Sequence, residues 1–257
     1  MLKWFGRNKG QGGDTPLAAL VPNGQRIYAV GDIHGCHQQL LALLQQIIDD
    51  ATGYNGNVTL VFLGDYINRG PASAQVLQTL CVKPWPSKWQ VVCLRGNHEQ
   101  ALLDFMKNPT RMPDWLYWGG IETLASYHIQ IQHQGRPRGP ESLAAELNDM
   151  LNEQGHLNFL KATQLTYQRD SNLFVHAGVR PNVPLARQLP SDLLFIRDDF
   201  IGRPHGLPYR VVFGHTIQPT PLMENDRIGL DTGAYKGGPL TAVKLEDIHV
   251  TFLQQEA

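Results

Sequence analysis

Short apolar runs that end at a glycine recur along the chain. The first three lie at residues 26–31, 57–64 and 89–96, and at least the first two lead directly into apolar residues at helical spacing. Their near-continuous Val, Leu, Ile and Phe content is typical of strands buried on both faces of a sheet. Repeated strand-to-helix units of this kind predict an α/β fold, with helices on at least one side of the sheet.

The pattern changes in the middle of the chain and then returns. Residues 108–170 have no such strand and predict a helical insertion that helps to wall a cleft. Three more apolar runs follow, and residues 239–247 and 248–255 alternate in polarity, which predicts a terminal antiparallel hairpin. Within the insertion, the aromatic side chains are expected to pack rather than to stack on a ligand, and the histidines are expected at the surface; these are Trp115, Tyr117, Trp118, His128, His133 and His156.

Composition excludes several classes of function. The formal net charge of −1 gives no strong field for polyanions, so nucleic acid is not an expected partner. No stretch approaches the length of an apolar membrane span. The three cysteines have no zinc-site spacing and favour a reducing cytoplasm. Residues 1–24 are expected to form a flexible tail before a single domain over 25–257, and nothing in the sequence indicates an oligomeric state.

Polar residues of a particular kind follow the predicted strands. Catalytic residues of α/β folds gather at the carboxyl ends of strands, so these side chains are expected to meet. They are Asp32, His34, Asp65, Asn97, His98, His176 and His215.

Oxygen and nitrogen ligands without cysteine suit manganese, iron or zinc, and the set is too large for one ion with open positions. Two ions can share it, with Asp32 and His34 on the first and Asp65 between the two. Asn97, His176 and His215 then belong to the second ion. Two such ions clamp the oxygens of an in-line phosphoryl displacement and generate hydroxide near neutral pH.

The motifs that carry these residues resemble those of a known family. GDIHG, GDYINRG, RGNHE, HAG and GH occur in this order and resemble the signature of the calcineurin-like metallophosphoesterases, in particular the bacterial type of phosphoprotein phosphatase. The resemblance spans about residues 26–234. It implies a sandwich of two mixed β-sheets flanked by helices. It also implies that all the residues listed above except His98 are metal ligands, which makes six ligands.

The resemblance also implies a reaction. His98 would be the general acid, and Arg69, Arg95 and Arg197 would hold phosphate oxygens, as suits the planar guanidinium. A hydroxide on two divalent ions, with manganese preferred and iron and zinc as alternatives, would attack phosphorus in line. The preferred function is a serine/threonine protein phosphatase acting on a phosphoprotein or a phosphorylated small molecule.

Asn68 stands where the protein phosphatases have an aspartate that supports the protonated form of the acid. Its amide oxygen can still accept a hydrogen bond from an imidazole N–H, but it supplies no charge, so a lowered pKa is expected for His98. Asn68, RGPAS and WGGIETLASY favour the alternative, a symmetrical dinucleoside tetraphosphate hydrolase, whereas Glu99 argues against it.

Two other classes are less favoured. A binding module without catalysis would be expected to have lost ligands, and all six are present. A nuclease or phosphodiesterase would be expected to carry GHxH at the last motif, where this chain has Ile217 in place of the second histidine.

Overall fold

The computed structural model describes residues 21–256. Most of the tail expected over residues 1–24 lies outside this range. Val21 is fully buried, and its N–H donates to the carbonyl of Asp247 at 3.2 Å. The packed fold therefore includes Val21 rather than starting at residue 25. Among the described residues, no helix combines the length and apolar character needed to cross a bilayer.

The first sheet has five strands in the order β12-β11-β1-β2-β3. The three glycine-terminated runs form its parallel part, and the predicted terminal hairpin is confirmed as its antiparallel edge. Its strands are β1 (Gln25–Val30), β2 (Asn57–Phe62), β3 (Gln90–Cys93), β11 (Leu240–Glu246) and β12 (His249–Gln255). Each parallel strand leads into a helix, namely α1 (His37–Ala51), α2 (Ser73–Val82) and α3 (Asn97–Lys107).

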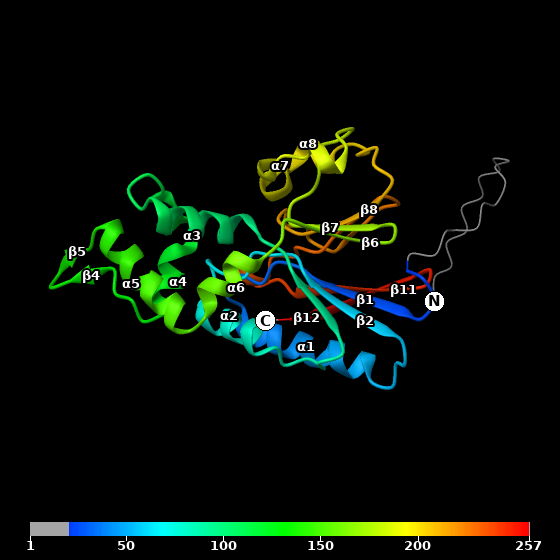
Figure 1. Ribbon diagram of the computed structural model, residues 1–257, viewed down its shortest axis with the longest axis horizontal. Coiled ribbons are helices and arrows are strands. Elements are labelled where there is room, and N and C mark those ends of the chain that lie inside the picture. Colours follow the sequence, from blue (N-terminus) through cyan, green and yellow to red (C-terminus); the bar gives the residue numbers. More distant parts are fainter. Residues whose placement is uncertain (1–20, 257) are drawn as a thin grey trace.

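The second sheet also has five strands, in the order β6-β7-β8-β10-β9. They are β6 (Thr166–Arg169), β7 (Asn172–Val175), β8 (Arg210–Phe213), β9 (Leu222–Met223) and β10 (Arg227–Gly229). The short helices of this half are η2 (Leu185–Arg187), α7 (Pro190–Phe195), α8 (Asp198–Ile201) and η3 (Ala234–Lys236). Figure 1 shows the two sheets as adjacent layers, with α1 and α2 outside the first and α7 and α8 outside the second.

Apolar side chains from both sheets meet between the layers, including Ile27, Val61, Phe174 and Val212, each at most 1% exposed. The sheets thus bury one face against each other and the opposite face against helices, which explains why the central strands are nearly continuous in apolar residues. The predicted α/β class, with two mixed sheets in a sandwich flanked by helices, is confirmed.

The segment predicted as a helical insertion lies to one side of the sheets (Figure 1). It contains the π-helical turn η1 (Leu116–Gly120), α4 (Ile121–Ser126), α5 (Pro140–Glu153) and α6 (His156–Ala162), with a small hairpin of β4 (Gln132–His133) and β5 (Arg136–Pro137). The predicted boundary needs correction, because residues 166–169 form β6 of the second sheet.

One histidine of this segment contradicts the surface expectation. His156 is fully buried. Its Nδ1 lies 2.6 Å from the Tyr127 hydroxyl, and its Nε2 lies 3.1 Å from the side-chain oxygen of Gln78. The two polar partners satisfy both ring nitrogens inside the helical packing.

Candidate active site

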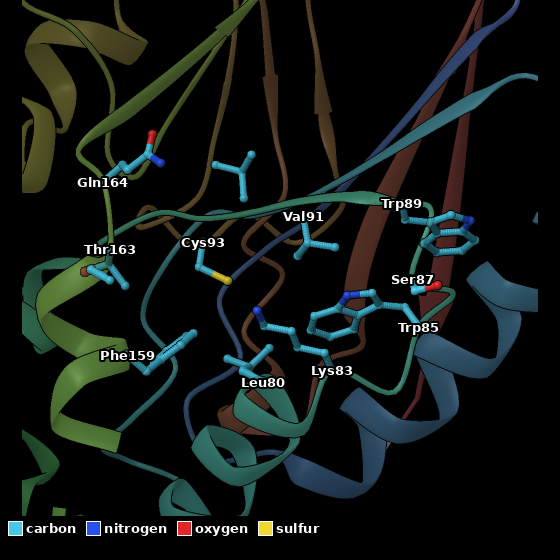
Figure 2. Close-up of a pocket in the computed structure, with 12 residues that line it drawn as sticks. Leu80, Lys83, Trp85, Ser87, Trp89, Val91, Cys93, Phe159, Thr163 and Gln164 are labelled. Atoms are coloured by element: carbon cyan, nitrogen blue, oxygen red, sulfur yellow. The ribbon is translucent and has the colours of Figure 1, made fainter. Parts of the chain in front are cut away.

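Residues that follow the strands of both sheets line one polar cavity of about 310 Å³. The predicted residues on its wall are His34, Asp65, Arg69, His98, Arg197 and His215. A larger cavity of about 470 Å³ runs along the edge strand β3 and is lined by Lys83, Trp85, Trp89 and Cys93 (Figure 2). It contains none of the predicted site residues, so the chemistry belongs to the smaller cavity.

The backbone around the smaller cavity is unusual. His34, Asp65, Asn68, Arg69 and His215 all have positive φ angles, between 46° and 72°. Non-glycine residues rarely adopt this conformation, and such strain concentrates at functional sites.

Two glycines make room for the ligand side chains. A Cβ on Gly96 would lie 2.0 Å from Asp65 Oδ1, and a Cβ on Gly214 would lie 2.0 Å from Asp32 Oδ1. The carboxylates therefore occupy the space that any larger residue would need.

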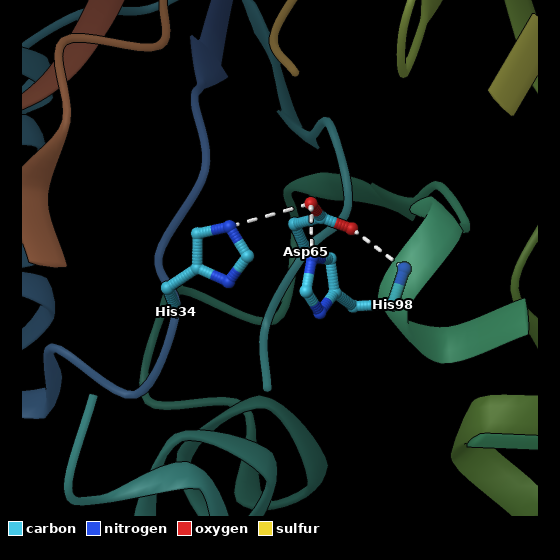
Figure 3. A group of neighbouring side chains, drawn as sticks. All are labelled: His34, Asp65 and His98. Atoms are coloured by element: carbon cyan, nitrogen blue, oxygen red, sulfur yellow. Dashed lines mark hydrogen bonds and ion pairs between the residues drawn. The ribbon is translucent and has the colours of Figure 1, made fainter. Parts of the chain in front are cut away.

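Asp65 lies at the centre of the cavity. Its Oδ2 is 3.4 Å from His34 Nε2 and 4.0 Å from His98 Nε2, and its Oδ1 is 3.4 Å from His176 Nε2 (Figure 3 shows the first two). Asp65 is shared by two groups of donor atoms that could each hold a cation, one with His34 and His98, the other with His176 and His215.

Asp32 and Asn97 lie beside these groups. Both oxygens of Asp32 accept the backbone N–H of His215 at 3.0 Å, and Asn97 Oδ1 is 2.9 Å from His176 Nε2. The structure thus brings all six predicted ligands to one place, while their division between two ions stays a prediction.

The histidine tautomers fit a cation. His34 Nδ1 lies 2.9 Å from the Ile67 carbonyl, and His176 Nδ1 lies 3.0 Å from the Leu63 carbonyl. Because a carbonyl only accepts, each Nδ1 carries the proton and each Nε2 presents a lone pair to the Asp65 carboxylate. A cation between these facing acceptors, which lie 3.4 Å apart, would relieve their repulsion. His215 Nε2 is also buried without a hydrogen-bond partner among the described residues.

The electrostatics support the same conclusion. Burial lowers the pKa of His98 to about 4 and that of His215 to about 3, so both rings are neutral near pH 7. Burial, reinforced by Asp231 and Asp65, raises the pKa of Asp32 above its usual range. Burial opposes ionisation of Asp65, and only positive charge beside it, such as a proton on the adjacent histidines, His176 foremost, would hold its pKa below the usual range. A divalent cation would neutralise this buried carboxylate charge, so the residues present fit such an ion.

Glu99 joins two of the loops that carry the site. It is fully buried, and its carboxylate accepts the backbone N–H groups of Asp65 and Tyr66 at 2.8 Å and of Gly96 at 2.9 Å. Glu99, the residue whose identity disfavoured a dinucleotide hydrolase, therefore positions the backbone of these loops and does not line the cavity.

The contact between Asn68 and His98 differs from the prediction. Asn68 Nδ2 lies 2.9 Å from His98 Nδ1, and Asn68 Oδ1 accepts the Thr123 hydroxyl at 2.7 Å. The amide nitrogen donates, because the amide oxygen already has a partner. His98 therefore carries its proton on Nε2, on the side that faces Asp65 and the cavity.

The three predicted phosphate-binding arginines separate into two groups. Arg69 and Arg197 line the cavity, and Arg197 Nη1 also donates to the His215 carbonyl at 3.0 Å. Arg95 is not among the residues that line the cavity in this structure, which differs from the expectation. Its guanidinium instead donates to Gln100 Oε1 at 3.0 Å and to groups at the end of α6, including Thr163 Oγ1 at 3.0 Å. There it acts as a cap for the helix C-terminus.

Five residues outside the predicted set also line the cavity, namely Thr216, Ile217, Asp231, Tyr235 and Lys236. Asp231 follows β10, and Tyr235 and Lys236 lie on the turn η3. The Tyr235 ring packs edge-on to His34 with centroids 4.9 Å apart and lies 5.6 Å from the Arg69 guanidinium carbon. The signal in the sequence is the LDTGA stretch at a strand end, which lacks the histidine that marks the other loops.

Comparisons with known proteins agree with this site. The sequence model of the calcineurin-like phosphoesterase family matches residues 25–223. The chain is 30% identical to a symmetrical bis(5'-nucleosyl)-tetraphosphatase from Neisseria meningitidis, over 88% of this chain and 95% of the relative. It is 28% identical to an asymmetrical bis(5'-nucleosyl)-tetraphosphatase from Bacillus velezensis, over 85% of this chain and 88% of the relative.

Solved structures share the fold. A crystal structure provisionally assigned as a diadenosine tetraphosphatase aligns with a TM-score of 0.61 and 23% identity, over 93% of this chain and 98% of the other. A protein serine/threonine phosphatase from Saccharomyces cerevisiae aligns with a TM-score of 0.53 and 15% identity, over 91% and 80%. With two sheets, a buried Asp/His cluster and a family match over most of its length, the chain belongs to the calcineurin-like phosphoesterases and is a metal-dependent phosphoester hydrolase.

Proposed function

We propose that this phosphoesterase hydrolyses dinucleoside tetraphosphates symmetrically, to two nucleoside diphosphates. The observation that carries the proposal is the amide of Asn68, which donates to His98 Nδ1. A donor at Nδ1 opposes protonation of that nitrogen, so it does not stabilise the imidazolium that a poor leaving group such as a serine alkoxide requires. A nucleotide phosphate is a much weaker base and departs with only a hydrogen bond from Nε2–H.

The residues of the cavity have distinct roles in this reaction. Two divalent cations, manganese preferred, would be held by Asp32, His34, Asp65, Asn97, His176 and His215. When bound, such ions polarise phosphoryl oxygens and make water more acidic. Arg69 and Arg197 hold the phosphate oxygens by charge-assisted hydrogen bonds, and His98 Nε2–H faces the departing oxygen.

The products define the reaction. A water oxygen forms a bond to one of the two inner phosphorus atoms, and the bond from that phosphorus to the central bridging oxygen breaks. Each half then leaves as a nucleoside diphosphate, and the proton released by water goes to solvent. Attack at an outer phosphorus would instead give a mononucleotide and a nucleoside triphosphate.

The relatives support a dinucleotide substrate, since both a symmetrical and an asymmetrical tetraphosphatase align over most of the chain. The symmetrical mode is preferred because the Neisseria relative aligns over 95% of its own length at 30% identity. The serine/threonine protein phosphatase activity that the motifs also allow is the competing function.

A paired assay tests the proposal. Manganese-loaded protein receives diadenosine tetraphosphate in one arm and a phosphothreonine peptide in the other, and the two kcat/KM values are compared. We expect the dinucleotide to be preferred, with ADP as the sole nucleotide product by chromatography. Preference for the peptide would overturn the proposal, and AMP with ATP would overturn the symmetrical mode. Asp65→Asn is the control for contaminating activity.

A further inference from the structure

The turn η1 and helix α4 dock directly on the loop that carries Asn68 and Arg69. The Gly119 carbonyl accepts the Arg69 N–H at 3.4 Å. Thr123 is fully buried, and its hydroxyl accepts the Asn68 N–H at 3.0 Å while it donates to the Asn68 side chain. Segment 116–126 is therefore tied to the active-site loop at both its backbone and its side chains.

The docking depends on a break in the helix at Gly119. This glycine has φ +99°, and a Cβ there would lie only 2.4 Å from the Arg69 nitrogen. The preceding residue, Trp118, also leaves helical geometry, with φ −83° and ψ 15°. Irregular π-helical turns of this kind are frequent at functional sites.

Two of the three aromatic side chains around the break are exposed. Trp115 is fully buried and stacks on Phe105 with centroids 4.8 Å apart, as predicted. Tyr117 is 79% exposed and Trp118 is 37% exposed, which contradicts the expected packing. Among residues 21–256, neither ring has a hydrogen bond, an ion pair or a ring-stacking partner.

We propose that Tyr117 and Trp118 form a stacking platform for one nucleobase of the substrate. The inference rests on the proposed dinucleotide function and names its specificity determinants. Trp118 adjoins the residue that is hydrogen-bonded to Arg69, whose guanidinium lines the cavity. When the inner phosphates lie against Arg69, one phosphate and one ribose bring the base out at the rim of the cavity.

The chemistry of the pair suits a base without selecting which one. Every nucleobase presents a π-face, and base-to-aromatic stacking contributes roughly 1–3 kcal/mol per base on alanine substitution. The η1 backbone is anchored through Gly119 and Thr123, so little ordering is needed before the base binds.

Kinetics of Tyr117→Ala and Trp118→Ala test the platform with two substrates. Diadenosine tetraphosphate reaches the rim, whereas p-nitrophenyl phosphate fills only the cavity. We expect kcat/KM for the dinucleotide to fall by roughly 5- to 100-fold, mostly through KM, because 1–3 kcal/mol of stacking is lost. We expect p-nitrophenyl phosphate turnover to be unchanged and Trp118→Phe to restore most of the loss. Ile248→Ala, also exposed at 51%, is the matched control on the β11–β12 turn.

Calorimetry adds a readout independent of turnover. ADP and ribose 5-diphosphate differ only in the base and keep the spacing between the inner phosphate and the base, so Trp118→Ala should weaken binding of the first and leave binding of the second unchanged. Equal effects on both ligands, or wild-type kcat/KM for the dinucleotide in both alanine variants, would overturn the platform while leaving the dinucleotide function intact. If the wild-type protein prefers the peptide, yet Trp118→Ala loses affinity for ADP, the proposed function alone would be overturned.

Discussion

Replacing Arg95 by alanine distinguishes the two roles proposed for this arginine, phosphate binding and helix capping. Its guanidinium makes hydrogen bonds to the Gln100 side chain, to Thr163 Oγ1, and to the carbonyls of Lys161 and Thr163 at 3.2 and 3.3 Å. All these acceptors lie away from the cavity that holds Arg69. The capping role predicts a loss of stability with no loss of catalysis.

The size of the stability loss follows from these contacts. A hydrogen bond contributes a net 0.5–1.5 kcal/mol. Water can replace the exposed contact with the Lys161 carbonyl and part of the other three contacts, which are part-buried, so together they count as roughly two bonds. We expect Arg95→Ala to lower the free energy of unfolding by about 2 kcal/mol. For a chain of this size, that corresponds to a Tm lower by about 4–8 °C. Arg95→Lys keeps the charge but loses the planar guanidinium, so its Tm should lie between those of the wild type and Arg95→Ala.

The assay pairs thermal unfolding with kcat/KM on a common phosphoester. Arg69→Ala is the counterpart: its side chain lines the cavity, and losing a bidentate phosphate contact of about 3 kcal/mol should reduce kcat/KM roughly 100-fold. The Tm of Arg69→Ala should barely change. If Arg95→Ala loses activity to the same extent as Arg69→Ala while its Tm stays at the wild-type value, the capping assignment is wrong.

Three further predictions concern charge. Asn68→Asp should raise turnover of an alkyl phosphate more than that of an aryl phosphate, because a carboxylate at His98 Nδ1 favours the imidazolium; equal gains would refute this. Chelation should lower the Tm by several degrees, and Mn²⁺ should restore it, since buried Asp65 and its neighbours lose a counter-charge; a Tm indifferent to chelator would contradict the metal site. Burial lowers the pKa of His156, so below about pH 6.5 the unfolded chain binds a proton that the folded chain does not, and stability falls. Urea titrations at several pH values should show this loss as a slope of about 1 kcal/mol of unfolding free energy per pH unit, and the slope should be absent in His156→Gln.

The strand ends were predictable because two local signals coincide there. A buried strand reads as a continuous apolar run, and the tight turn after it needs glycine beside the functional residue, as at Gly96 and Gly214. Parallel strands then place these turns on one edge of the sheet. Asp231 also lies just after a buried strand and near a glycine, but its loop has no histidine or arginine that would mark it as part of the site.

The errors have a different origin, because they depend on where a side chain points. Arg95 precedes Gly96 and its ligand turn, but its side chain leaves the opposite side of the chain and reaches α6, about 65 residues later in sequence. Nothing in the local pattern encodes that contact. Tyr117 and Trp118 have an apolar character that predicts burial, and only the backbone break at Gly119 leaves them exposed.

The orientation of the Asn68 amide shows why one substitution in a shared motif can alter the chemistry. Thr123 donates to one end of the amide, so the other end, facing His98, is the NH₂ group. An aspartate held by the same threonine would present an oxygen there, move the imidazole proton to Nδ1 and stabilise the charged ring. Thr123 lies on the segment that also carries Trp118. This one segment would therefore set both the pKa of the general acid His98 and the recognition of the nucleotide that leaves. A chain with Asn68 but without this segment would lack the fixed amide, and its acid could take either tautomer.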